Sequence, residues 1–171
     1  GILKGKSDSN VKDVSKLTVN EISDYLKSNK LTIMEKNVFQ AMKEFNLGNK
    51  EKAITTLENL YSQEKLFTED GGSNPEKIKA LEALTNFYQK NGDTEKIKEK
   101  YDDFIANIDN VLQKNTNLES KNQLQKYKDS IISTKVSKVC QGNSNYGDCL
   151  NTFSDLNSDS KNRLFVNYEK K

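Results

Sequence analysis

The most constraining feature of this sequence is a short pattern that occurs twice. It reads GNKEKAI from Gly48 and GDTEKI from Gly92, and apolar residues at helical spacing precede and follow each copy. Glycine readily adopts the left-handed backbone conformation that ends helices. The residue that follows it, Asn49 or Asp93, is of a type favoured as the N-cap of a new helix. Each copy therefore predicts a tight turn between two helices.

Further helix starts are marked by capping boxes, in which a Thr and a Glu three residues later each accept a hydrogen bond from the other's backbone. Three such pairs are present: Thr18 with Glu21, Thr32 with Glu35, and Thr116 with Glu119. Asn74 followed by Pro75 is another start signal, because proline is tolerated in the first helical turn. Asp148 is expected to cap a short helix, and a last short helix is expected within residues 158–171.

The apolar residues between these signals recur at the spacing of amphipathic helices. In the segment 33–47 the predicted inner face is Met34, Val38, Ala41, Met42 and Phe45. The segment 118–139 carries a sparser stripe, which consists of Leu118, Leu124, Tyr127, Ile131, Val136 and Val139. No stretch shows the two-residue alternation of a strand, so we predict an all-α fold.

The order of the signals also predicts how the helices pair. Helices 33–47 and 50–63 are expected to form one antiparallel hairpin, and helices 75–91 and 94–113 another, stacked side by side. Together they belong to a single helical domain over residues 17–171.

Residues 1–16 are polar, rich in Gly, Ser, Lys and Asp, and show no helical period. We expect a flexible leader here. It is either a cloning remnant with a linker or the tether that follows the lipidated cysteine of a mature bacterial lipoprotein.

The turn pattern resembles the tetratricopeptide repeat, a family in which two helices are paired through a glycine-containing turn. Gly48 and Gly92 match that glycine, and Ala53 matches the small residue where the paired helices cross. Ile97 holds the same place in the second copy, which implies a looser crossing. The copies lie farther apart than that family's repeat of about 34 residues, and the resemblance covers only residues 33–111. It implies hairpins stacked into a short solenoid; a small helical bundle that shares only the turn chemistry is the alternative.

Tetratricopeptide repeats usually bind their ligands along the first helix of each hairpin, so the resemblance implies a binding face on 75–91. Lys79, Asn86 and Lys90 lie on one side of that helix, opposite its apolar stripe. Two ammonium groups beside an amide would suit a carboxylate or an acidic peptide. An ordinary solvated face is the alternative interpretation.

Residues that could carry catalysis or hold a metal are sparse. The chain has no His, which excludes a histidine-based triad or zinc site. Residues 155–159 have the opening spacing of a calcium loop, but Ser160 and Val166 stand where that loop needs Gly and Glu, so a capped turn is predicted. Carboxylates such as Asp102 and Asp103 are expected to be solvated. We predict no catalytic residue, no metal site and no cofactor, and hence no enzyme.

The charge balance excludes a nucleic-acid partner. The chain has 27 basic and 25 acidic residues, a net charge of +2, and its lysines are interspersed with Asp and Glu. No basic patch follows from this pattern, and the lysines are expected to cover solvated helix surfaces. No apolar run approaches the roughly 20 residues that a membrane helix needs. Membrane attachment is therefore expected only through a lipid anchor at the N-terminus.

The two cysteines, Cys140 and Cys149, bracket the turn-rich stretch QGNSNYGD. Such a stretch readily brings two sulfur atoms together, so we predict a disulfide that closes the long helix onto a short one. A pair of buried thiols in a cytosolic protein is the alternative. A bond here would stabilise the fold by roughly 2–3 kcal/mol and would indicate an oxidising compartment.

The leader, the cysteine pair and the abundance of Asn and Lys together resemble the small helical surface lipoproteins of AT-rich bacteria, spirochaetes in particular. That resemblance implies an extracytoplasmic protein, on the cell surface or in the periplasm, that binds a host or envelope protein or peptide. The alternative is a structural or assembly scaffold of the envelope.

Overall fold

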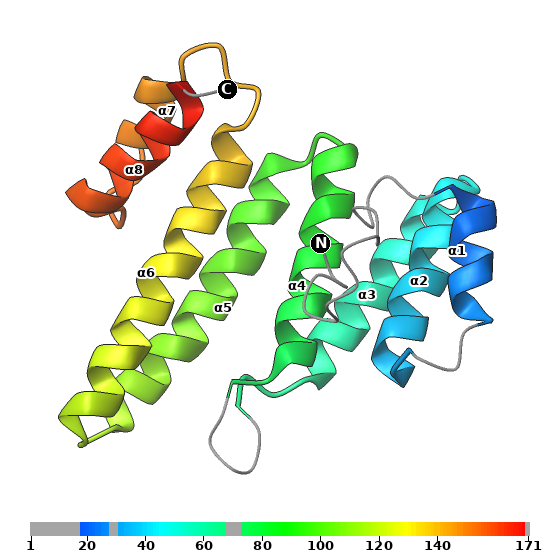
Figure 1. Ribbon diagram of the computed structural model, residues 1–171, viewed down its shortest axis with the longest axis horizontal. Helices are drawn as coiled ribbons and strands as arrows, with labels where there is room; N and C mark the ends of the chain where they lie inside the picture. The colour runs from blue at the N-terminus through cyan, green and yellow to red at the C-terminus, as the bar shows by residue number, and fades with distance from the viewer. Residues whose placement is uncertain (1–17, 28–30, 68–72, 170–171) are drawn as a thin grey trace. The chain divides into compact units, whose positions relative to one another are not determined.

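The computed structural model describes residues 18–27, 31–67 and 73–169 (Figure 1). Within these ranges the chain forms helices and no strand, so the prediction of an all-α fold is confirmed. The helices are α1 (Val19–Leu26), α2 (Ile33–Asn46), α3 (Lys50–Gln63), α4 (Pro75–Lys90), α5 (Thr94–Lys114), α6 (Leu118–Cys140), α7 (Tyr146–Asn151) and α8 (Ser158–Glu169). The predicted leader, residues 1–16, lies outside the described residues. No described helix is long and apolar enough to cross a membrane.

The helices fall into two compact units, and the boundary along the chain lies between Asn91 and Gly92. The first unit contains α1 to α4 and the second contains α5 to α8. The single domain predicted for residues 17–171 thus corresponds to two units. That the two act as one domain stays a prediction.

The predicted helix boundaries hold where a side chain can reach the exposed N–H groups of a first turn. Thr32 Oγ1 accepts a hydrogen bond from the N–H of Glu35, and Glu35 Oε1 accepts one from the N–H of Thr32, both at 3.1 Å. The box of Thr18 and Glu21 forms in the same way. Asn74 Oδ1 accepts the N–H of Glu76 at 3.1 Å and so caps α4.

The two glycine turns form as predicted, but the residue after each glycine does not act as a side-chain cap. Gly48 and Gly92 have φ angles of +99° and +73°, the left-handed conformation that the turn requires. Asn49 and Asp93 occupy the N-cap positions of α3 and α5 without a capping hydrogen bond. Asn49 Nδ2 instead donates to Glu44 Oε2 at 2.7 Å, so its side chain is committed to the preceding helix.

Two predicted caps were assigned to the wrong residue. The cap of α6 is Asn117, whose Oδ1 accepts the N–H of Ser120, and not Thr116. The cap of α7 is Asn145, whose Oδ1 accepts the N–H of Asp148. An asparagine side chain reaches the third helical N–H as well as a threonine does, so a neighbouring Asn competes for the cap position.

The first unit is built on the predicted stripe of α2. All five residues of that stripe are buried, and the turn at Gly48 folds α3 back along α2, so the hairpin of 33–47 with 50–63 is confirmed. On the inner face of α3, Ala53, Leu57 and Tyr61 are buried. Helix α4 packs on α3 and α2, and the rings of Phe45 and Phe87 stack with centroids 4.4 Å apart.

A lysine is buried within this first unit. Lys77 of α4 is 6% exposed, and its Nζ donates to the backbone carbonyl oxygen of Tyr61 at 2.8 Å. The same ammonium lies 3.7 Å from the centroid of the Tyr61 ring. It therefore adds a second, charged donor to a carbonyl group at the end of α3, which also accepts the N–H of Glu64 at 3.3 Å.

The second predicted hairpin, 75–91 with 94–113, is not confirmed. Helix α5 has 21 residues and pairs with α6, which has 23, and α4 belongs to the first unit. A glycine turn sets where one helix ends and the next begins, but it does not determine the partner against which each helix buries its apolar face. The predicted stacking of two repeat-like hairpins is therefore not confirmed either.

In the second unit, α5 buries more apolar residues than α6 does. Helix α5 buries Ile97, Tyr101, Phe104, Ile105 and Ile108. Helix α6 buries only part of its predicted stripe, and Leu118 at its start is 73% exposed. The short helices α7 and α8 both pack against α6.

Candidate functional site

The face predicted from the repeat resemblance lies on α4, in the first unit. Lys79 is half-buried and its Nζ lies 3.6 Å from Glu76 Oε1, so part of its charge is already neutralised. Asn86 is half-buried as well, and Lys90 is exposed with its Nζ 5.9 Å from the centroid of the Phe45 ring. The three side chains share one side of the helix, but Lys79 and Lys90 already interact with Glu76 and Phe45 of this unit.

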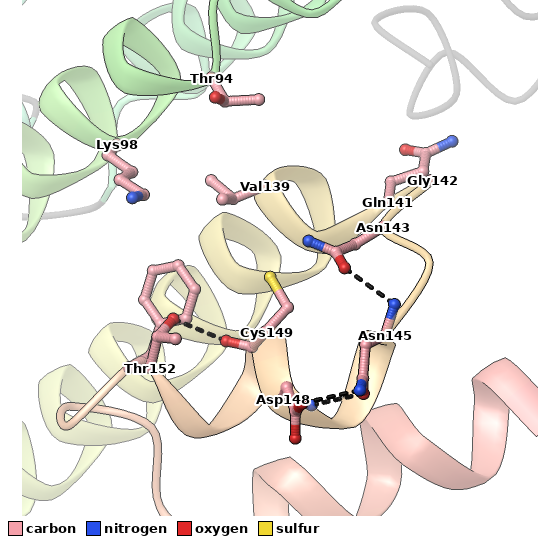
Figure 2. Close-up of a pocket in the computed structure, with 11 residues that line it drawn as sticks. Thr94, Lys98, Val139, Gln141, Gly142, Asn143, Asn145, Asp148, Cys149 and Thr152 are labelled. Atoms are coloured by element: carbon pink, nitrogen blue, oxygen red, sulfur yellow. Dashed lines mark hydrogen bonds between the residues drawn. The ribbon is translucent and has the colours of Figure 1, made fainter.

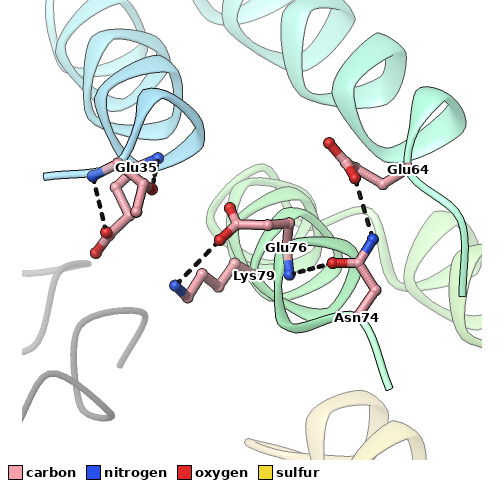
Figure 3. Close-up of polar contacts among 6 residues, drawn as sticks. Glu35, Glu64, Asn74, Glu76 and Lys79 are labelled. Atoms are coloured by element: carbon pink, nitrogen blue, oxygen red, sulfur yellow. Dashed lines mark hydrogen bonds and ion pairs between the residues drawn. The ribbon is translucent and has the colours of Figure 1, made fainter. Parts of the chain in front are cut away.

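The start of α4 shows why Lys79 is held in place (Figure 3). Asn74 caps Glu76, and its Nδ2 donates both to Glu64 Oε2 at 3.1 Å and to the backbone oxygen of Lys65 at 2.8 Å. These bonds fix the first turn of α4 against the end of α3, and Glu76 in that turn is the partner of Lys79 (Figure 3). The arrangement serves the fold, and it leaves the binding role of Lys79, Asn86 and Lys90 a prediction.

A better candidate is an open depression in the second unit, of about 570 Å³, beside the cysteine loop (Figure 2). The first two turns of α5, the end of α6, the loop after it and helix α7 surround it. Its lining combines Lys98 and Asp148, the aromatic ring of Phe153, the side chain of Val139 and several amides. Sequence reasoning missed this site because its polar residues look like ordinary loop residues.

A run of local hydrogen bonds shapes the loop wall of the depression. Gly142 turns the chain with a φ of +79°. The N–H of Asn145 then donates to Asn143 Oδ1 at 2.9 Å, and Asn145 Nδ2 donates to Asp148 Oδ2 at 2.7 Å (Figure 2). These bonds lead directly into the capped first turn of α7, so the loop has one defined path.

A disulfide closes the same wall. The sulfur atoms of Cys140 and Cys149 are bonded, which confirms the predicted pairing, and no described cysteine is free. Cys140 is the last residue of α6 and Cys149 lies within α7. The bond therefore fixes the short helix to the end of the long one.

The ring of Phe153 lies close to two ammonium groups. Lys98 Nζ is 5.7 Å from its centroid and Lys135 Nζ is 5.4 Å from it, both within the range of cation–π attraction. Lys98 also forms an exposed ion pair with Glu95 Oε1 at 3.2 Å. One face of the depression thus offers an aromatic surface next to a cation.

Lys135 is a buried charge that the sequence did not reveal. Its Nζ lies 2.9 Å from Asp102 Oδ1 and 2.7 Å from Asp155 Oδ2, and its side chain is 5% exposed. Burial by itself lowers the pKa of Lys135, but the hydrogen bonds and charges of the two aspartates outweigh it and raise that pKa above 10.5. The ammonium therefore ties α5, α6 and the segment before α8 together.

Asp102 and the turn predicted for residues 155–159 both lie beside Lys135. Asp102 is exposed, as expected, but it also pairs with Lys135. Asp155, the first residue of the calcium-like spacing, pairs with the same lysine, and Asn157 Oδ1 accepts the N–H of Ser160 at 2.8 Å. The capped turn predicted for residues 155–159 is thus confirmed.

An aromatic cluster joins α7 to α8. The rings of Tyr146 and Tyr168 stack with centroids 4.1 Å apart, and Phe165 meets Tyr146 edge-on at 6.4 Å. Burial raises the pKa of Tyr146, an effect that a hydrogen bond with Ser137 partly offsets. Phe165 and Tyr168 remain 39% and 45% exposed, so the cluster forms at the edge of the unit.

Comparison of the chain with protein-family models, with curated proteins and with solved structures finds no match. The functional argument therefore rests on the chemistry of the residues described above.

Proposed function

We propose that this chain is a non-enzymatic protein-binding module of an exported bacterial protein, and that its partner binds in the depression of the second unit. The observation that carries this proposal is the mixture of groups around that open volume: an ammonium, an aromatic face and side-chain amides. Protein interfaces combine such groups, whereas small-molecule sites are enclosed and mainly apolar. A peptide segment of a host or envelope protein fits this chemistry best.

Each group suits a different part of a peptide. The ring of Phe153 and the side chain of Val139 offer an apolar contact, and the ammonium of Lys98 offers a partner for a carboxylate. The existing pair of Lys98 with Glu95 is exposed, so exchanging it for a carboxylate of the partner costs little. The amide of Asn143 is suited to the peptide backbone. We therefore propose an acidic segment that also carries an apolar side chain.

The proposal includes a place outside the cytoplasm, on the cell surface or in the periplasm, with a lipid anchor at the N-terminus. The bond between Cys140 and Cys149 supports this, because disulfides persist mainly in oxidising compartments. Protease treatment of intact cells separates the two locations. Cleavage of the chain in intact cells indicates the surface, and protection until the envelope is opened indicates the periplasm.

The likeness to the tetratricopeptide repeat is proposed for the hairpin of α2 and α3 alone. Its support is Ala53, which is 1% exposed in the helix that follows the Gly48 turn. A small residue at that place lets two helices approach closely.

The binding site can be tested with synthetic peptides. One peptide carries Asp and Glu around a Leu, and a matched peptide carries Lys in place of each acidic residue. We expect the acidic peptide to shift the backbone amide NMR signals of Lys98 and Phe153, and the basic peptide to leave them unchanged.

Matched variants make the test sharper. Lys98→Glu should abolish the shifts, because it replaces the cation with a repelling charge, and Phe153→Ala should weaken them. The control is Lys79→Glu together with Lys90→Glu on α4. If this control abolishes binding while Lys98→Glu preserves it, the site belongs to the face on α4. If neither peptide shifts any signal, the proposal is contradicted.

A structural or assembly role in the envelope is the second candidate. The observation that favours it is the exposure of apolar side chains on α8, where Val166 is exposed and where Phe165 and Tyr168 remain partly exposed although both contact Tyr146. Exposed apolar residues in one short helix favour self-association. Sedimentation of the wild type and of Val166→Asp tests this role, since only the wild type should form a concentration-dependent dimer.

A further inference from the structure

The two sulfur atoms of the disulfide have different surroundings. Cys140 has no exposed surface, whereas Cys149 is half-buried and lines the depression (Figure 2). A reagent in the solvent can therefore approach Cys149, which lines the depression, and not Cys140.

The depression contains a cation as well as the carboxylate of Asp148, and Asn145 Nδ2 already donates to Asp148 Oδ2 at 2.7 Å. Lys98 belongs to its lining, and a positive charge attracts an approaching thiolate, which is the reactive form of a thiol. The bond that such a thiolate would break fixes a weakly held segment. Helix α7 has only six residues, of which Tyr146 and Leu150 are buried, and α8 buries only Ser160.

We propose that Cys149 is a site of thiol–disulfide exchange that small thiols reach through the depression. The thiolate attacks Cys149 Sγ and forms a new S–S bond there, while the bond to Cys140 breaks. The electron pair of the broken bond stays on Cys140 as a thiolate, which takes a proton from water. The product is a mixed disulfide on Cys149 and a free thiol on Cys140. The thiol is the only co-reactant that the step needs.

The position of Cys140 favours this direction of cleavage. It lies at the last residue of α6, where the helix dipole disfavours an anion, so the new thiolate is readily protonated. A protonated Cys140 is slow to attack the mixed disulfide, and the adduct on Cys149 persists. The released loop can then move away from the end of α6, and one wall of the depression changes shape.

The proposal concerns the same depression as the proposed binding function. It rests on that proposal only in taking the depression to be open to solvent, and it does not require that a partner binds there. Its readout is the mass of an adduct and not the binding of a partner, so each proposal can fail without the other. The probes are 2-mercaptoethanesulfonate, which is negatively charged, and 2-mercaptoethanol, which is neutral. Folded protein is treated with each thiol, the excess thiol is removed, and the protein is labelled with N-ethylmaleimide in denaturant so that a buried Cys140 thiol also reacts. Its peptides are then mapped by mass spectrometry.

The expected result is the small thiol on Cys149 and the maleimide on Cys140. The reverse labelling, equal labelling of both cysteines, or reaction only in denaturant that unfolds the second unit would overturn the proposal. Circular dichroism recorded during the reaction shows whether the protein is still folded when the thiol reacts.

A variant of Lys98 tests whether the thiol reaches Cys149 through the depression. Lys98→Gln should slow the reaction of the charged thiol roughly two- to fivefold at low salt and leave the neutral thiol nearly unaffected. Lys79→Gln, in the first unit, is the matched control and should change neither rate. Equal rates of the charged thiol with the wild type and with Lys98→Gln would rule out the depression as the route.

Discussion

The last helix of the first unit and the last helix of the second are held by different forces. Helix α4 buries eight of its 16 residues, among them Leu81, Leu84, Phe87 and Tyr88, whereas α8 fully buries only Ser160 among its 12 residues. A buried Leu or Phe side chain stabilises a fold by about 1.5–3 kcal/mol. The segment of α7 and α8 buries fewer large apolar residues, namely Tyr146, Leu150 and Leu156, and it is held in addition by a disulfide, a buried lysine and aromatic rings at the edge of the unit.

This difference indicates which part of each unit should open first. In the first unit the last helix is part of the core, so its loss and the loss of the unit should coincide. In the second unit α7 and α8 should be able to loosen while α5 and α6 remain paired, since local opening follows low apolar burial. Variants in the two segments can therefore test whether α8 contributes less to the stability of its unit than α4 does, and by how much.

The largest expected difference is between two leucine-to-alanine variants, one in α4 and one in α8. Leu84 in α4 is fully buried, and Leu84→Ala should lower the free energy of unfolding by about 2–5 kcal/mol, because it leaves a cavity. Leu164 in α8 is only half-buried, and Leu164→Ala should cost about 1 kcal/mol or less. Urea unfolding of both variants measures the difference. Equal losses would show that α8 is as much part of a core as α4 is.

The disulfide comes next. Replacing Cys140 and Cys149 together by Ser should lower the free energy of unfolding by roughly 2–3 kcal/mol, because the unfolded chain regains the freedom of a closed loop. Hydrogen exchange should become faster in α7 and α8 and stay unchanged in α2 to α4. Faster exchange in the first unit would contradict the independence of the two segments.

Removing the charge of Lys135 should have a smaller effect. Lys135→Met keeps most of the side-chain stem, and it should cost about 1–2 kcal/mol, since the two aspartates are partly exposed and can be hydrated. The pKa of Lys135 is raised in the folded protein, so its stabilising contribution is complete below the ordinary value of 10.5 and is lost as the pH rises through the folded value. The difference in stability between the wild type and Lys135→Met should therefore stay constant from pH 7 to pH 9 and shrink only above 10.5. A difference that shrinks below pH 9 would show that another group is responsible.

The smallest expected effect concerns two helix caps. Asn74→Ala removes a cap that accepts the N–H of Glu76, and it should cost roughly 1 kcal/mol. Asp93→Ala removes a residue that occupies the N-cap position of α5 without a capping hydrogen bond, so it should cost only a few tenths of a kcal/mol. Thermal unfolding of both variants tests the contrast. A larger loss for Asp93→Ala would mean that its carboxylate stabilises α5 through the helix dipole or through its pair with Lys96, whose Nζ lies 3.9 Å from Asp93 Oδ2.

Much of the local structure was predictable from the sequence, because it depends on interactions between near neighbours. Examples are the capping box of Thr32 and Glu35, the turn at Gly48 and the stripe from Met34 to Phe45. In each of them, the residues that act together are only a few positions apart in the sequence. The disulfide belongs to the same group, since the stretch between its cysteines is short and rich in turn residues.

The pairing of helices and the candidate site were not predictable in this way. Asp102, Lys135 and Asp155 lie on three separate segments, and only the packed helices bring them together. No spacing rule joins such residues in a single sequence. The same holds for Lys98 and Phe153, which meet at the depression from α5 and from the segment after α7.

Lys77 and Lys135 give each unit a chemical reporter of its own. Acylating reagents modify lysines that are accessible and have lost their proton, and these two side chains are buried against a carbonyl oxygen in one unit and two carboxylates in the other. Both should therefore be modified far more slowly than the exposed lysines of this chain. Acylation at Lys77 then measures how often α4 separates from α3, and acylation at Lys135 measures how often the segment before α8 leaves α6. One labelling time course in living cells would thus follow the opening of both units at once.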